Sequence, residues 1–180
     1  MTGWERQIVE ALRGKVFEAV ERTAHLVSLA PPNRLEWTPE LPNCELPASD
    51  LGHLLGHLLD CLAGFCAAFY AAFPQELADF AELRSIPVNH FCRPDEAAIK
   101  IELYSKHINR GFQLCTDEDL RRKTRTVFVP GGQRLLTVLL GNLEHLVNHK
   151  YQLFFYLKLM GVPLTTTDLY VLRGAQETRA

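Results

Sequence analysis

The sequence has little excess charge of either sign, and this excludes a broad class of partners. Its 180 residues include 19 lysines and arginines against 21 aspartates and glutamates, a formal net charge of −2. The isoelectric point is near 6.4. Proteins that bind nucleic acid through a broad face need clustered basic side chains to contact the phosphates. We therefore expect no nucleic-acid partner.

Cysteine is sparse, and its spacing matches neither a zinc finger nor a disulfide framework. The cysteines are odd in number and form no CxxC pair: Cys44, Cys61, Cys66, Cys92 and Cys115. Reduced thiols of this kind are typical of proteins in a reducing compartment. The N-terminal segment MTGWERQIVEALRGKVFEAVERT is charged throughout, so we expect no signal peptide and a cytoplasmic location.

Only one stretch, residues 51–73, is apolar enough to suggest a membrane span. It contains His53, His57 and Asp60, which are costly against lipid. We therefore interpret it as a buried helix with a polar stripe and expect no membrane partner.

Composition and length predict a single folded domain, residues 1–180. Hydrophobic residues make up 47% of the chain and charged residues 22%, which are ordinary globular values. No internal repeat or long linker divides the sequence, and a chain of this length is typical of one domain.

Hydrophobic periodicity and helix-stop residues predict four long helices. Their expected spans are 3–30, from Ser49 or Asp50 to Pro74, from Pro94 or Asp95 to Leu114, and 133–160. Prolines fill the segment that follows the first helix, so we interpret residues 31–47 as an ordered crossing loop. The TRTVFVP segment after the third helix has strand character, so a short extended piece or a hairpin is an alternative there. The fold class expected is all-α, an antiparallel four-helix bundle with long crossing loops.

Two pairs of histidines stand out on these helices. His145 and His149 are four residues apart in the last helix, and His53 and His57 have the same spacing in the second. Four residues in a helix place two side chains on one face, about 6 Å apart along the axis. Two imidazoles on one face can bind one metal ion. Buried imidazole nitrogens without partners cost stability, so a metal shared between helices is a reasonable interpretation.

The segments DLGHLLGHLLDCLAGF and LLGNLEHLVNHKYQLFFYLKLMGVP resemble the DinB/YfiT-like superfamily of metal-binding four-helix bundles. Its members carry a histidine about seven residues after a Ser or Asp that starts the second helix, as His57 follows Asp50 here. They carry HxxxH on the last helix, usually followed by Arg-Gly-Gln and then a glycine. The last helix here has Lys150, Tyr151 and Gln152 at those positions, and Gly161 further on. Trp37-Thr38-Pro39 matches a frequent feature of the first loop.

The resemblance implies a three-histidine site for a divalent metal, with His57, His145 and His149 as its ligands. The ion it implies is Zn²⁺, Ni²⁺ or Fe²⁺. Gln152 is either a residue that orients a ligand or an ordinary polar residue of the helix. His53 has no counterpart in the family, so we expect it outside the ligand set. The change from Arg-Gly to Lys-Tyr leaves the ligands intact.

Two function classes stay open. The first is a divalent-metal-dependent enzyme, such as a hydrolase or, by resemblance, a transferase that uses a low-molecular-weight thiol. Asp60 and Glu144 are candidate acid or base residues, and Cys61 is either a reactive thiolate or an inert buried thiol.

The second function class is a non-catalytic, stress-related homodimer with a structural or vestigial metal site. Residues 65–73 and 154–159 either fill the core or supply a dimer face.

Overall fold

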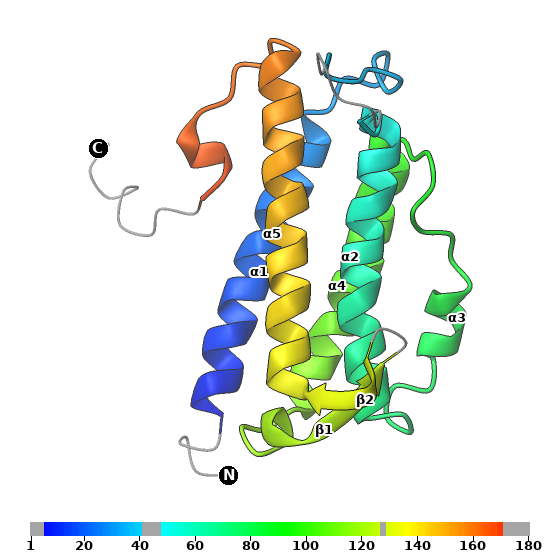
Figure 1. The fold of residues 1–180 in the computed structure, drawn as a ribbon, viewed down its shortest axis with the longest axis vertical. Helices are drawn as coiled ribbons and strands as arrows, with labels where there is room; N and C mark the ends of the chain where they lie inside the picture. The colour runs from blue at the N-terminus through cyan, green and yellow to red at the C-terminus, as the bar shows by residue number, and fades with distance from the viewer. Residues whose placement is uncertain (1–5, 41–47, 127–128, 171–180) are drawn as a thin grey trace.

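The structure is a computed structural model that describes residues 6–40, 48–126 and 129–170. Cys44 lies outside the described residues, as does the start that we expected for the first helix. Four long helices lie side by side as a bundle (Figure 1). They are α1 (Gln7–Ser28), α2 (Leu51–Ala72), α4 (Pro94–Leu114) and α5 (Leu135–Leu159). The shorter elements are α3 (Phe80–Arg84), two 3₁₀ turns, η1 (Asp119–Arg121) and η2 (Thr166–Asp168), and the strands β1 (Lys123–Thr126) and β2 (Val129–Arg134). The all-α fold class is confirmed.

Local end signals set the limits of the long helices. The Asp50 carboxylate caps α2 by accepting from the backbone N–H of His53, which satisfies an amide that has no partner inside the helix. Pro94 occupies the first turn of α4, where its missing N–H costs nothing. Gly161 follows α5 with a φ of 85°, the left-handed conformation in which glycine ends helices. The first helix ends at Ser28 rather than at residue 30.

The helix directions differ from the antiparallel arrangement that we expected. α2 and α4 are parallel: Cys92, just before α4, donates its backbone N–H to Gly52 O near the start of α2. Gly111 near the end of α4 faces Phe69 near the end of α2. The physical reason is the connection of residues 73–93, which includes α3 and returns the chain along the bundle (Figure 1).

A short antiparallel hairpin closes the end of the bundle where α4 ends and α5 begins (Figure 1). Lys123 pairs with Arg134 and Thr124 with Gln133, and a register shift follows Thr124. The sequence led us to expect Gln133 and Arg134 in the last helix. Instead, both belong to β2. Their ladder pairing with β1 replaces the first helical turn.

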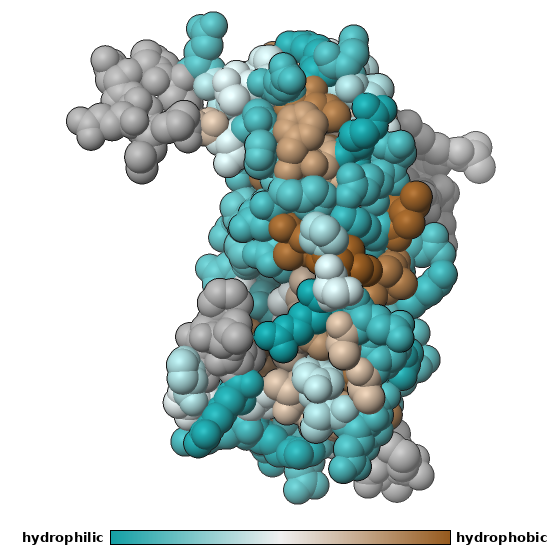
Figure 2. All heavy atoms as spheres, turned by 90° about the vertical axis from the view of Figure 1, so that its right-hand side faces the viewer, coloured by the Kyte–Doolittle hydropathy of each residue, from teal (hydrophilic) through white to brown (hydrophobic). Residues whose placement is uncertain are grey.

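α2 supplies more buried hydrophobic side chains than any other helix of the described chain. The sequence left open whether residues 65–73 fill the core or form a dimer face. Phe65 and Phe69 of this segment are fully buried and pack in the core. Among the described residues, α2 is the one helix long and apolar enough to cross a membrane by length and composition, and most of it is buried inside the bundle. The face that carries α3 and its connection is largely hydrophilic, with scattered apolar patches (Figure 2).

Candidate metal centre

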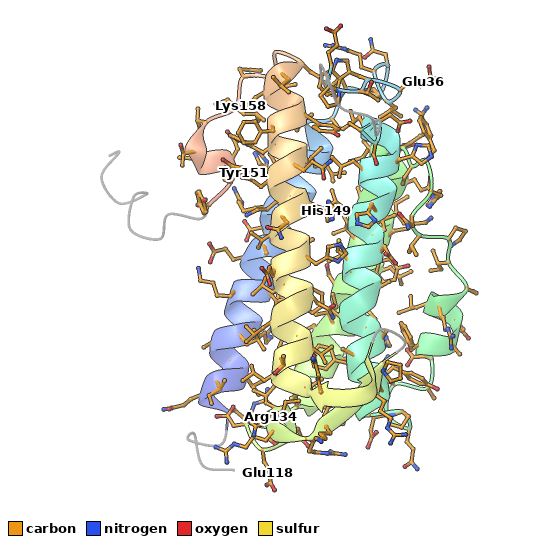
Figure 3. The ribbon with its side chains drawn as sticks, in the orientation of Figure 1. Glu36, Glu118, Arg134, His149, Tyr151 and Lys158 are labelled. Atoms are coloured by element: carbon orange, nitrogen blue, oxygen red, sulfur yellow. The ribbon has the colours of Figure 1, made fainter. Side chains whose placement is uncertain are left out.

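The antiparallel packing of α2 on α5 brings the three predicted histidines together. His57 Nε2 lies 3.2 Å from His145 Nε2 and 3.0 Å from His149 Nε2. His145 and His149 are one turn apart on α5, and Figure 3 shows His149 on the side of that helix that faces α2. The structure therefore places three imidazole nitrogens around one point, drawn from two helices.

Asn89 fixes the orientation of the His57 ring. Its Oδ1 lies 2.9 Å from His57 Nδ1, and because an amide oxygen only accepts, Nδ1 carries the proton and donates. Asn89 has a φ of 58°, a left-handed conformation that asparagine adopts more readily than most residues. Its backbone N–H donates to Gly56 O, one residue before His57. The connection between α3 and α4 is thus bound to α2 beside the site.

A chain of three hydrogen bonds fixes the orientation of His149. Tyr156 Oη donates its one proton to Ser49 O at 3.0 Å. The same oxygen accepts from Gln152 Nε2 at 3.1 Å. The other atom of that amide, Gln152 Oε1, accepts from His149 Nδ1 at 2.9 Å. Trp37 packs edge-on against Tyr156, with ring centroids 5.4 Å apart. The predicted Trp-Thr-Pro loop and Gln152 therefore both support one histidine.

These bonds leave the Nε2 lone pairs of His57 and His149 directed at each other. In two neutral rings that each donate from Nδ1, neither Nε2 carries a proton, so the 3.0 Å contact is not a hydrogen bond between neutral rings. Nitrogens that each lie about 2.0–2.1 Å from one tetrahedral ion are separated by about 3.3 Å. The observed spacings and the donor types fit a divalent transition-metal ion.

The surroundings of His145 and His149 favour the neutral form of each ring, which is the form that binds metal. Burial lowers the pKa of His145 below its ordinary value, His57 acts in the same direction, and Asp60 opposes them. Burial also lowers the pKa of His149, while the bond to Gln152 acts against that shift. Cys61 lies within the same group, and burial raises the pKa of its thiol to about 12.

The other candidate residues lie outside this group. His53 is exposed, and its Nδ1 contacts the Asp50 carboxylate at 2.9 Å. Glu144 is exposed, and Asp60 is half-buried. Lys150 is buried and donates to Leu169 O at 3.0 Å, so it anchors the C-terminal segment instead of facing the metal position. Tyr151 is on the side of α5 opposite His149 (Figure 3).

A second group of metal-ligating types lies at the start of α4: His90, Cys92 and Glu96. Glu96 Oε1 accepts from Lys100 Nζ at 2.6 Å and contacts His90 Nε2 at 2.9 Å. These contacts lower the pKa of Glu96 to about 2. A lysine ammonium already neutralises this carboxylate, so the group fits an ion pair that anchors the connection. Sequence reasoning identified neither this group nor Asn89.

Comparison with known proteins supports the architecture. No protein-family model matches the sequence, and no curated protein matches it. A crystal structure of a DinB-like protein (YjoA) from Bacillus subtilis is similar, with a TM-score of 0.61 over 84% of this chain and 92% of that chain. The two sequences are 16% identical, so this likeness shows the fold alone.

Proposed function

We propose that this chain, which has the DinB-like fold, binds one divalent transition-metal ion through His57, His145 and His149 and is a metal-dependent enzyme. The supporting observation is the 3.0 Å approach of two Nε2 atoms in rings whose Nδ1 atoms contact the amide oxygens of Asn89 and Gln152. Between neutral rings that both donate from Nδ1 such a contact is repulsive, and a cation bound by both nitrogens relieves it.

Taken alone, three histidine ligands leave coordination positions open, as in catalytic rather than structural zinc sites. A divalent ion held there lowers the pKa of a bound water or thiol and polarises a substrate. The chain's own contribution is orientation: Asn89 and Gln152 hold two rings in the tautomer whose Nε2 is free to bind. His145 is exposed, so a substrate reaches the site from its side.

For the reaction, we propose metal-assisted transfer of a low-molecular-weight thiol, with hydrolysis as the variant that uses water. A reducing compartment such as the cytoplasm suits this chemistry. The four described cysteines are also free. The assay combines metal-loaded protein with a small thiol and chlorodinitrobenzene. Thiol consumption that the His149→Ala variant loses supports the transferase, and a rate equal to that of the variant contradicts it.

Elemental analysis after loading with Zn²⁺ and with Ni²⁺ tests the metal site. We expect one ion per chain in the wild type and its loss in each of His57→Ala, His145→Ala and His149→Ala. His53→Ala is the matched control, because it removes an imidazole from the same helix but outside the group. Metal-free wild-type protein, or equal loss in the control, contradicts the proposal.

The exposed apolar side chains of α5 favour the second candidate, a homodimer with a structural or vestigial site. Val147, Tyr151 and Phe155 follow one another at spacings of four residues, and all three are exposed. A protein that binds metal and dimerises but accelerates no thiol or water reaction would support this candidate over the enzyme.

A further inference from the structure

Cys61 lies within reach of the metal position that the three histidines surround. It follows His57 by one turn of α2, and its side chain is 2% exposed. Its Sγ and one ring nitrogen of each histidine lie within 4.8 Å of one another. Because side chains four residues apart share one face of a helix, α2 presents a nitrogen and a sulfur to the same point.

Hydrogen bonding distinguishes Cys61 from the other buried cysteines of the described chain. The thiols of Cys66, Cys92 and Cys115 each donate to a backbone carbonyl oxygen, at 3.8, 3.4 and 3.5 Å. Among the residues that the structure describes, no backbone carbonyl oxygen accepts from Cys61 Sγ. Cys61 belongs to the buried core, and the three imidazole nitrogens within 4.8 Å of its sulfur give it the position of a metal ligand as well.

On the basis of the proposed metal site, we propose that Cys61 is the fourth protein ligand of that ion. Coordination exchanges the S–H bond for a sulfur–metal bond and releases the proton to solvent, and no oxidant or reductant takes part. Thiolate with imidazole is a ligand set that suits zinc and other late transition metals. Four protein ligands close a tetrahedral site, so a substrate has to displace Cys61 or enter as a fifth ligand. Cys61 therefore regulates access to the metal.

Titration of the metal-free chain with Co²⁺ in the absence of oxygen tests this assignment. Visible d–d bands report that the ion is bound in a tetrahedral site. A near-ultraviolet sulfur-to-cobalt charge-transfer band reports a thiolate ligand. We expect both bands in the wild type and loss of the near-ultraviolet band alone in Cys61→Ser. Cys66→Ser is the matched control, because it removes a buried thiol from the same helix, and it keeps both bands.

The two bands separate failure of this assignment from failure of the metal site. Visible bands without the near-ultraviolet band, or a near-ultraviolet band that persists in Cys61→Ser, overturn the role of Cys61 and leave the three-histidine site intact. The absence of both bands overturns the metal site and the role of Cys61 with it.

A second measurement needs no variant and so does not depend on the folding of Cys61→Ser. X-ray absorption at the zinc edge of the wild-type chain loaded with one equivalent of Zn²⁺ identifies the ligand atoms. We expect one sulfur at about 2.3 Å beside nitrogens at about 2.0–2.1 Å. A shell of nitrogen and oxygen alone overturns the assignment.

Discussion

The side chain of Asn89 links the segment between α3 and α4 to His57 at the proposed metal site. Its amide oxygen accepts from His57 Nδ1 at 2.9 Å, and so it holds the ring in the tautomer with an unprotonated Nε2. Residues in this position orient a ligand and raise its basicity, and their loss weakens metal binding without removing the ligand.

The Asn89→Ala variant is expected to bind Zn²⁺ about 10–100-fold more weakly than the wild type. The ring of His57 then rotates freely and its Nε2 is no longer held unprotonated. Competition with a chromophoric chelator measures the dissociation constant. Asn148→Ala, an exposed position on α5, is the control and should match the wild type. Unchanged affinity in Asn89→Ala would show that His57 needs no orienting partner.

At the scale of elements, Gly56 determines how closely the α3–α4 connection approaches α2. A Cβ atom added at Gly56 would lie 1.8 Å from the backbone oxygen of His90. No side-chain rotation relieves a contact with backbone, so residues near His90 have to move. Asn89 moves with them, because its N–H donates to Gly56 O.

The Gly56→Ala variant is therefore expected to lower the free energy of unfolding by about 1–3 kcal/mol and to weaken metal binding as well. Urea denaturation and the chelator competition measure the two effects. Gly141→Ala in α5 is the control, because nothing lies within 4 Å of its added Cβ. It should stabilise the chain by about 0.5–1 kcal/mol, the helix preference of alanine over glycine. Equal stability changes in the two variants would contradict this account.

The elements differ in how far their sequence determines them. Asp50, Pro94 and Gly161 act within one turn of their own helices, so the limits of α2, α4 and α5 could be predicted to within two residues. The HxxxH spacing is likewise local, and the DinB-like resemblance supplied its partner His57. Asn89 could not be found in this way, because its contact with His57 depends on a connection that returns along the bundle. The parallel pairing of α2 with α4 depends on the same connection.

For the whole molecule, the histidines make stability depend on pH. Burial lowers the pKa of His145, His149 and His107 in the folded chain, whereas in the unfolded chain each is near its ordinary value of about 6.5. Below that pH the unfolded chain takes up protons first, and proton uptake favours unfolding. The stabilisation is therefore complete above about pH 6.5 and is lost as the pH falls through the lowered values.

The metal-free protein is accordingly expected to lose stability between about pH 6.5 and pH 5, where most carboxylates have not begun to titrate. Urea denaturation at a series of pH values measures the loss. The double variant His145→Gln with His149→Gln should show a shallower decline, with His107 accounting for part of what remains. A decline of equal steepness in the double variant would show that these two rings do not contribute.

The side of α5 that faces away from the three histidines carries exposed aromatic side chains. Tyr151 and Phe155 are 46% and 45% exposed, and their rings pack edge to face with centroids 4.9 Å apart. Apolar side chains four residues apart form a stripe along one face of a helix. Helix-on-helix contact with a second copy would bury this stripe.

We therefore expect the wild type to sediment as a dimer at micromolar concentrations and the variant Tyr151→Lys with Phe155→Lys to sediment as a monomer. Two lysines on each copy place like charges in a desolvated contact, which is strongly unfavourable. Ile99→Lys is the control: Ile99 is 71% exposed on α4, on a different helix, so the dimer should persist. The three histidines lie between α2 and α5, away from Tyr151 and Phe155. The monomeric variant should therefore still take up one ion per chain. A wild type that sediments as a monomer would mean that this stripe of α5 is exposed in solution and that each chain forms its metal site alone.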